Sequence, residues 1–87
     1  MALEIKLTAT AQKYFEKLDK PTRKRIQEKL DAIAAAPFDP RLSKPLVDAS
    51  KRTARVGDYL ILFEVLNADL FVSDIAPRGR AYRKLNR

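Results

Sequence analysis

The 87-residue sequence contains no cysteine, no histidine and only two glycines. Without cysteine there can be no disulfide and no thiolate chemistry, and a zinc site of the usual His/Cys kind is excluded too. A histidine acid–base pair is also excluded, so any catalysis must use arginine, lysine, tyrosine, aspartate or glutamate. Two glycines are too few for a loop that cradles phosphates. We therefore predict no metal and no cofactor.

Long hydrophobic runs are also missing. The apolar run at residues 32–36 is far too short to span a membrane. The N-terminus MALEIKLTAT alternates from its start and has no signal-peptide pattern, so we predict a cytoplasmic location and no membrane partner. A hydrophobic fraction of 46% argues against disorder. The length fits one domain, residues 1–87, with a single modest core.

Positive charge is in clear excess, because 18 lysines and arginines face 11 acidic residues and leave a formal charge of +7. Such an excess indicates a polyanion or an acidic protein as the partner. The basic residues gather in three clusters, at residues 20–29, 41–55 and 78–87. We interpret the first as a solvated helix face. The other two are more segregated than solubility alone requires.

Hydrophobic periodicity predicts the element order β-α-α-β-β-β. Residues 3–7, LEIKL, alternate as a half-buried strand does, and apolar residues then recur at helical spacing up to Pro37, with a break near Pro21. Residues 37–50 contain three prolines and no period, which predicts a loop, and residues 51–75 form three strands separated by turn signals. The predicted fold class is α+β: a helix hairpin on one face of an antiparallel sheet, with the first strand at an edge.

The segment YLILFEV, residues 59–65, is apolar nearly throughout, which is typical of a central strand. Alternation places Tyr59, Ile61 and Phe63 on the core face. Leu60 and Leu62 then face the other side of the sheet, where we expect Leu60 to be partly exposed.

Two arginines are positioned to act together. Arg55 lies near the end of one predicted strand, Arg78 follows the last strand, and an antiparallel meander could bring both to one side of the sheet. The arginine fork suits phosphate oxygens and could stabilise the charge that develops in phosphodiester cleavage. Tyr82, among the basic residues of the tail, could stack on a base or exchange a proton.

The element order, together with RVGDYLILFEV at 55–65 and PRGRAYRK at 77–84, resembles the RelE/ParE superfamily of toxins, and most closely its RelE-like branch. The resemblance implies a toxin neutralised by a cognate antitoxin in a hetero-oligomer. RelE-like members enter the ribosomal A site and cut mRNA without a metal, using the 2′-hydroxyl of the RNA as nucleophile. ParE-like members instead act on a protein, DNA gyrase, and this alternative stays open, as does an inactive relative that only binds its antitoxin.

Carried over by position, the resemblance implies catalytic roles for Arg55, Arg78 and Tyr82. It implies RNA-binding roles for a further set of basic residues: Lys51, Arg52, Arg80, Arg83 and Lys84. Two cations of the family pattern are absent, because Leu60 stands where the pattern GDYR has arginine and Thr53 stands where it often has a basic residue. These departures imply a weakened nuclease, one that compensates through Lys51 or Arg52, or an inactive member.

Overall fold

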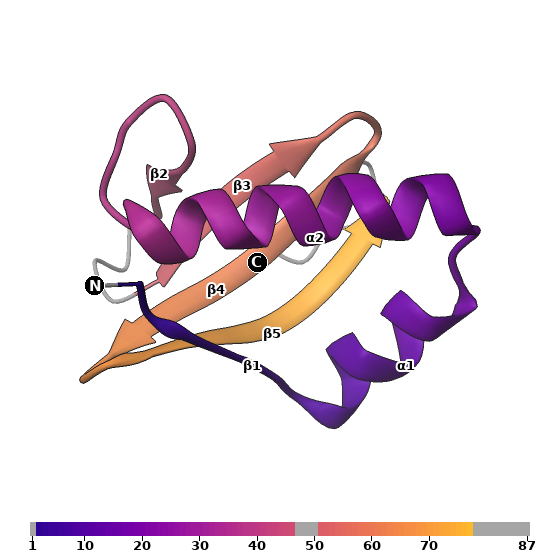
Figure 1. Cartoon of the computed structure of the whole chain (residues 1–87), viewed down its shortest axis with the longest axis horizontal. Coiled ribbons are helices and arrows are strands. Elements are labelled where there is room, and N and C mark those ends of the chain that lie inside the picture. The colour runs from indigo at the N-terminus through magenta and orange to yellow at the C-terminus, as the bar shows by residue number, and fades with distance from the viewer. Residues whose placement is uncertain (1, 47–50, 78–87) are drawn as a thin grey trace.

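The computed structural model describes residues 2–46 and 51–77 and shows two helices covering one face of a twisted sheet (Figure 1). This confirms the predicted α+β class and the predicted element order, with one short strand added inside the segment predicted to be a loop. The elements are β1 (Glu4–Leu7), α1 (Ala9–Lys17), α2 (Lys20–Ala35), β2 (Lys44–Pro45), β3 (Lys51–Val56), β4 (Tyr59–Leu66) and β5 (Asp69–Pro77).

The sheet has the strand order β1-β5-β4-β3-β2. β3, β4 and β5 form the predicted antiparallel meander, and β1 lies at an edge as predicted. β1 runs parallel to β5, however, so the sheet is mixed rather than wholly antiparallel. No hairpin joins these two strands, since both helices and the other strands lie between them, and turn chemistry therefore cannot fix their relative direction.

Each helix starts at a side-chain cap. The Thr8 hydroxyl accepts a hydrogen bond from the Ala11 amide at 3.2 Å, and the Asp19 carboxylate accepts one from the Thr22 amide at 3.4 Å. Pro21 occupies the first turn of α2, where its missing N–H costs nothing. In Figure 1 the helices diverge from their junction, so they splay apart rather than run side by side. Neither helix in the described ranges is long and apolar enough to cross a membrane.

The core lies between the helices and the covered face of the sheet. The apolar residues that recur at helical spacing along α2 are buried there, and so are the predicted core residues Ile61 and Phe63 of β4. β5 has an extra residue, Ser73, opposite the Leu62–Phe63 step, and its hydroxyl donates to the Leu62 carbonyl at 3.2 Å. The fully buried large side chains are Ile26, Leu30, Ile33, Ile61, Phe63, Leu70, Val72 and Ile75.

Both hairpins of the meander turn through two residues, the first of which has a positive φ. These residues are Gly57 between β3 and β4 and Asn67 between β4 and β5, each with φ 56°. Gly57 also gives room to a neighbour, because a Cβ placed there would lie 3.1 Å from the Arg25 Nη2 atom. The Gly57 turn is thus constrained by its backbone conformation and by the overlying α2 side chain.

We expect Gly57→Ala to lower the free energy of unfolding by about 1–2 kcal/mol, because a side chain in the left-handed region costs about that much. Thermal unfolding followed by circular dichroism would show a midpoint lower by roughly 4–8 °C per kcal/mol. Asn67→Gly is the matched control and should unfold like the parent chain. An unchanged midpoint for Gly57→Ala would contradict the conformation assigned to this turn.

Candidate functional site

β3 presents alternate residues to the two faces of the sheet. Ala54 and Val56 pack in the core under the helices, so Lys51, Thr53 and Arg55 point to the opposite face. We call this opposite face the open face. Cross-strand pairing places the following residues on it: Lys6, Lys44, Lys51, Thr53, Arg55, Leu60, Leu62, Glu64, Phe71, Asp74 and Ala76.

Arg55 is the predicted catalytic residue that the structure describes. Its side chain is exposed, and no hydrogen bond or ion pair reaches it from residues 2–46 or 51–77. Arg55 lies opposite Leu60, Leu60 lies opposite Ala76, and β5 ends one residue later at Pro77. Arg55 and the end of β5 are therefore at the same end of the sheet. The predicted proximity of Arg55 and Arg78 stays a prediction, because Arg78 lies outside the described residues.

Most of the other predicted site residues belong to the C-terminal tail. The predicted catalytic residues Arg78 and Tyr82 and the predicted RNA-binding residues Arg80, Arg83 and Lys84 lie outside the described residues. Lys51 is described, is exposed, and lies opposite Glu64 of β4, which places an acidic group beside it on the open face.

Arg52 points to the helix side of β3, away from Lys51 and Arg55. Its Nε donates to the Ser43 hydroxyl at 3.0 Å, its Nη2 donates to the Ser43 carbonyl at 3.4 Å, and its guanidinium lies 5.4 Å from the centre of the Phe38 ring. Ser43 in turn donates to the Pro37 carbonyl at 3.3 Å and is only 4% exposed. These contacts hold the loop after α2 against β3. The RNA-binding role of Arg52 stays a prediction.

Leu60 faces the open face as predicted, but the expectation that it is partly exposed is wrong. Only 4% of Leu60 is accessible. Its strand is paired on both sides, with Arg55 and Ala76 directly opposite it, and its side chain forms part of a cavity wall. Strand alternation gives the face on which a side chain lies but not its accessibility, so the sequence pattern could not predict this burial.

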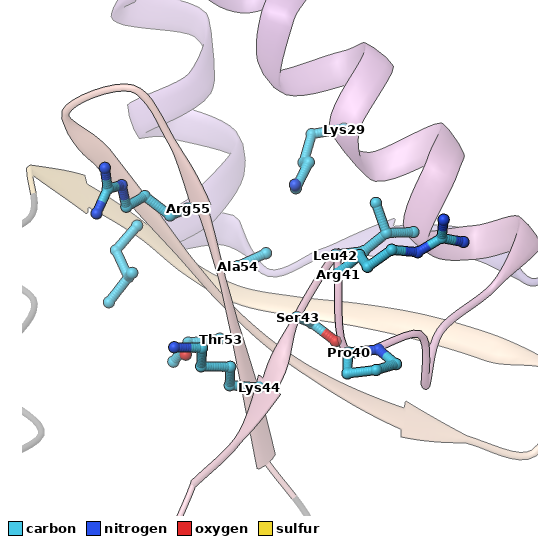
Figure 2. Close-up of a pocket in the computed structure, with 10 residues that line it drawn as sticks. Lys29, Pro40, Arg41, Leu42, Ser43, Lys44, Thr53, Ala54 and Arg55 are labelled. Atoms are coloured by element: carbon cyan, nitrogen blue, oxygen red, sulfur yellow. The ribbon is translucent and has the colours of Figure 1, made fainter.

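A cavity of about 260 Å³ lies at the β3 edge, where β2 pairs only with Arg52 and Thr53. A second hollow adjoins it between α2 and the β3–β4 turn. Together they form what we call the edge groove. Figure 2 shows Arg55 on one side of β3 and Lys29 of α2 on the other. The basic residues that line the edge groove are Arg25, Lys29, Arg41, Lys44 and Arg55.

Arg41 is the cation of the edge groove that has an acidic partner in the described structure. Its Nη2 and Nε donate to the Asp39 carboxylate at 2.8 and 3.1 Å, and its amide donates to the same carboxylate at 2.9 Å. Hydrogen bonds from the Arg41 side chain and amide lower the pKa of Asp39 from 3.8 to about 2. Part of the charge of Arg41 is therefore already compensated.

Arg25 and Lys29 belong to the cluster that the sequence pattern assigned to a solvated helix face, and their place at the groove was not predicted. They lie four residues apart, and so on one side of α2, and both line the edge groove. That spacing was visible in the sequence, but the strand edge facing it was not. Among residues 2–46 and 51–77, no group of three acidic, histidine or cysteine side chains is placed to hold a metal.

The chain is similar to known toxins. A family model described as the ParE toxin of the type II toxin–antitoxin system parDE matches residues 5–82. No curated relative matches.

Solved structures show the same fold. A chain of the RelBE2 toxin–antitoxin complex of Mycobacterium tuberculosis is 22% identical with a TM-score of 0.77, the match covering 90% of this chain and 100% of that one. A chain of the archaeal RelE–RelB complex of Pyrococcus horikoshii is 24% identical with a TM-score of 0.74, and the match covers 92% of this chain and 99% of that one. A chain of the YoeB dimer of Staphylococcus aureus is 19% identical with a TM-score of 0.72, and the match covers 87% of this chain and 97% of that one.

We expect Leu60→Ala to lower the free energy of unfolding by about 2–3 kcal/mol, since it removes buried apolar atoms. Leu60→Arg should cost at least as much, because a guanidinium would have to leave water. Chemical denaturation measures both. Leu66→Ala, in the same strand but 46% exposed, is the control and should change stability by less than about 0.5 kcal/mol. A Leu60→Arg protein as stable as the parent would refute the structural role of this leucine.

Asp39 should titrate with a midpoint near pH 2. Since its pKa is lowered in the folded chain, its contribution to stability is present above pH 4 and is lost as the pH falls through about 2. We expect Arg41→Ala to move the midpoint back towards 3.8, as read by carboxyl-carbon NMR. An unshifted midpoint in that variant would show that the Arg41 side chain is not the cause.

Proposed function

Because the chain belongs to the ParE toxin family of type II toxin–antitoxin systems, we propose that it is a toxin of the RelE kind, which cleaves mRNA in the ribosomal A site. The observation that carries this proposal is Arg55, exposed on the open face and unpaired within the described structure. The likeness of the fold to RelE toxins supports the same branch.

In the proposed reaction the RNA 2′-hydroxyl attacks the adjacent phosphorus. A bond forms between the 2′-oxygen and phosphorus, the bond to the 5′-oxygen breaks, and the products are a 2′,3′-cyclic phosphate and a free 5′-hydroxyl. The 2′-hydroxyl gives up its proton and the leaving 5′-oxygen gains one. Arg55 would stabilise the extra negative charge on the phosphate oxygens. Arg78 and Tyr82 are proposed to complete the site, with Tyr82 as the proton-exchanging or base-stacking group.

Lys51, Arg80, Arg83 and Lys84 are proposed as phosphate contacts on the RNA. Arg52 is less suited to such a contact, because its guanidinium is bound to Ser43 and stacked on Phe38 on the other side of β3. We assign it instead to holding the loop after α2. Lys51 shares its surroundings with Glu64, so its attraction for phosphate is weaker than that of Arg55.

The partner that neutralises the toxin is a cognate antitoxin, as the solved complexes of RelE-fold proteins support. We propose that the antitoxin segment bound here is an amphipathic helix or extended strand rich in acidic residues, because the chain carries a net charge of +7. Toxin and antitoxin would form a hetero-oligomer in the cytoplasm. Copurification with the product of the neighbouring reading frame tests this.

One observation favours a second function. Leu60 fills the position of the family arginine with a buried apolar side chain, which removes one cation from the proposed RNA site. A ParE-like toxin that binds a protein such as DNA gyrase would not need that cation, and the matching family model is the ParE model. An inactive member that only binds its antitoxin would not need it either.

Primer extension on mRNA after induction separates these functions. Discrete cuts in the A site support the RNA-cleaving toxin. Intact mRNA together with induced DNA damage supports the gyrase-binding alternative, and neither effect, with the antitoxin still bound, supports the inactive member.

We expect Arg55→Ala and Arg78→Ala each to reduce ribosome-dependent cleavage about 10²–10³-fold, the usual effect of removing one group that stabilises transition-state charge. Growth inhibition should be lost, while the fold and antitoxin binding remain. Lys24→Ala, exposed on α2, is the control and should cleave like the parent. Arg23 is unsuitable for this purpose, because its Nε is buried without a hydrogen-bond partner. Full cleavage by Arg55→Ala would exclude Arg55 from the site.

A further inference from the structure

The edge groove holds positive charge that the described structure does not compensate. Arg25, Lys29, Lys44 and Arg55 make no ion pair with residues 2–46 or 51–77, where the ion pairs are Lys6–Asp69 and Arg41–Asp39. Glu28 is the acidic residue among the side chains that line the groove. Four uncompensated cations around a concave surface create a positive potential that attracts an anion.

These cations lie on both sides of the β3 edge. Arg55 lines both hollows and belongs to the open face, whereas Lys29 approaches β3 from α2 on the helix side (Figure 2). Arg25 lies one helical turn before Lys29, with its guanidinium over Gly57. The positive surface is therefore continuous from the open face, around the edge of β3, to the side of α2.

We propose that the edge groove binds the phosphate groups of one RNA strand, which crosses the edge of β3 between the open face and α2. The proposal rests on the proposed function, because it extends the RNA from the site at Arg55. Arg25 and Lys29 would hold phosphates flanking the one at Arg55. The arginine fork matches phosphate oxygens with two parallel hydrogen bonds, and the lysines add point charge.

An acidic protein strand added to the same edge fits less well. On its outer edge, away from β4, β3 lacks a paired strand along Ala54–Val56, which is three residues against the usual strand length of about five or six. Protein partners are also anchored by apolar side chains. Phe38 and Leu66, the exposed large hydrophobic residues of the described chain, do not line the groove. Cations at a strand edge could also serve only to prevent pairing with other chains, and the experiment tests this as well.

The test compares two variants that each remove two lysine or arginine charges from α2. Arg25→Ala/Lys29→Ala removes groove cations, whereas Lys20→Ala/Lys24→Ala removes exposed cations that do not line the groove. The probe is a single-stranded RNA of about 12 nucleotides, within the usual site size, with 2′-O-methyl groups so that it cannot be cleaved. Binding is measured by fluorescence anisotropy at several salt concentrations, and circular dichroism checks each fold.

We expect Arg25→Ala/Lys29→Ala to bind the RNA about tenfold more weakly than the parent chain. The slope of log affinity against log salt concentration should become shallower by about 1.4, because each lost phosphate contact on a single strand accounts for about 0.7. The control variant should change affinity less than about twofold. Equal losses in both variants would show that only net charge matters and would overturn the proposal. Tripolyphosphate or polyglutamate binding the groove more tightly than the RNA would also overturn it, in favour of a small anion or an acidic protein.

The proposed cleavage of mRNA and the proposed binding of RNA in the edge groove can be refuted independently of each other. If no form of the protein cleaves mRNA on ribosomes, yet the two variants still differ in RNA binding, the proposed reaction is wrong and the groove assignment stands. If the parent cleaves and both variants bind RNA alike, the reaction stands and the groove assignment is wrong.

Discussion

The packing of one stripe of α2 onto one face of the sheet determines where the charged side chains of this chain can lie. Ile26, Leu30 and Ile33 are almost fully buried against a sheet face that includes Ile61 and Phe63. A strand offers only two faces, so once the helices cover one, the alternate residues of β3 must face the other. Lys51, Thr53 and Arg55 therefore point away from the helices. The same packing places the side of α2 with Arg25 and Lys29 next to the β3 edge.

Positive charge is not spread evenly over the resulting surface. At the β1 edge, Lys6 is bound to Asp69 at 3.2 Å and lies 5.8 Å from the centre of the Phe71 ring. At the start of β3, Lys51 lies opposite Glu64 of β4. Around the rest of the β3 edge, Arg25, Lys29 and Arg55 have no such partners in the described structure. Since interactions between exposed charges fade over about 8–10 Å in physiological salt, an anion would be attracted to the β3 edge rather than to the molecule as a whole.

The sequence predicted what depends on local periodicity and failed where distant neighbours decide. The helix break near Pro21, the meander and the core face of β4 follow from turn residues and alternation, which are set within a few residues. The parallel pairing of β1 with β5 joins residues more than sixty positions apart and has no local signal. The same holds for the candidate site. Arg55 was placed correctly by its strand position, whereas Arg52 turned out to be bound to Ser43, and the contribution of α2 was missed.

Leu60 shows how the fold limits the chemistry. It lies between Arg55 and Ala76 in one row across three strands, and it is buried at a position where an arginine would have to stay in contact with solvent. In this row the described cation is therefore Arg55, directly opposite Leu60, which stands where the family pattern has an arginine. Any anion bound at this end of the sheet must take its further positive contacts from elsewhere. Within the described residues, the uncompensated cations beside Arg55 are those around the β3 edge, so a phosphate chain held at Arg55 gains most by turning towards α2.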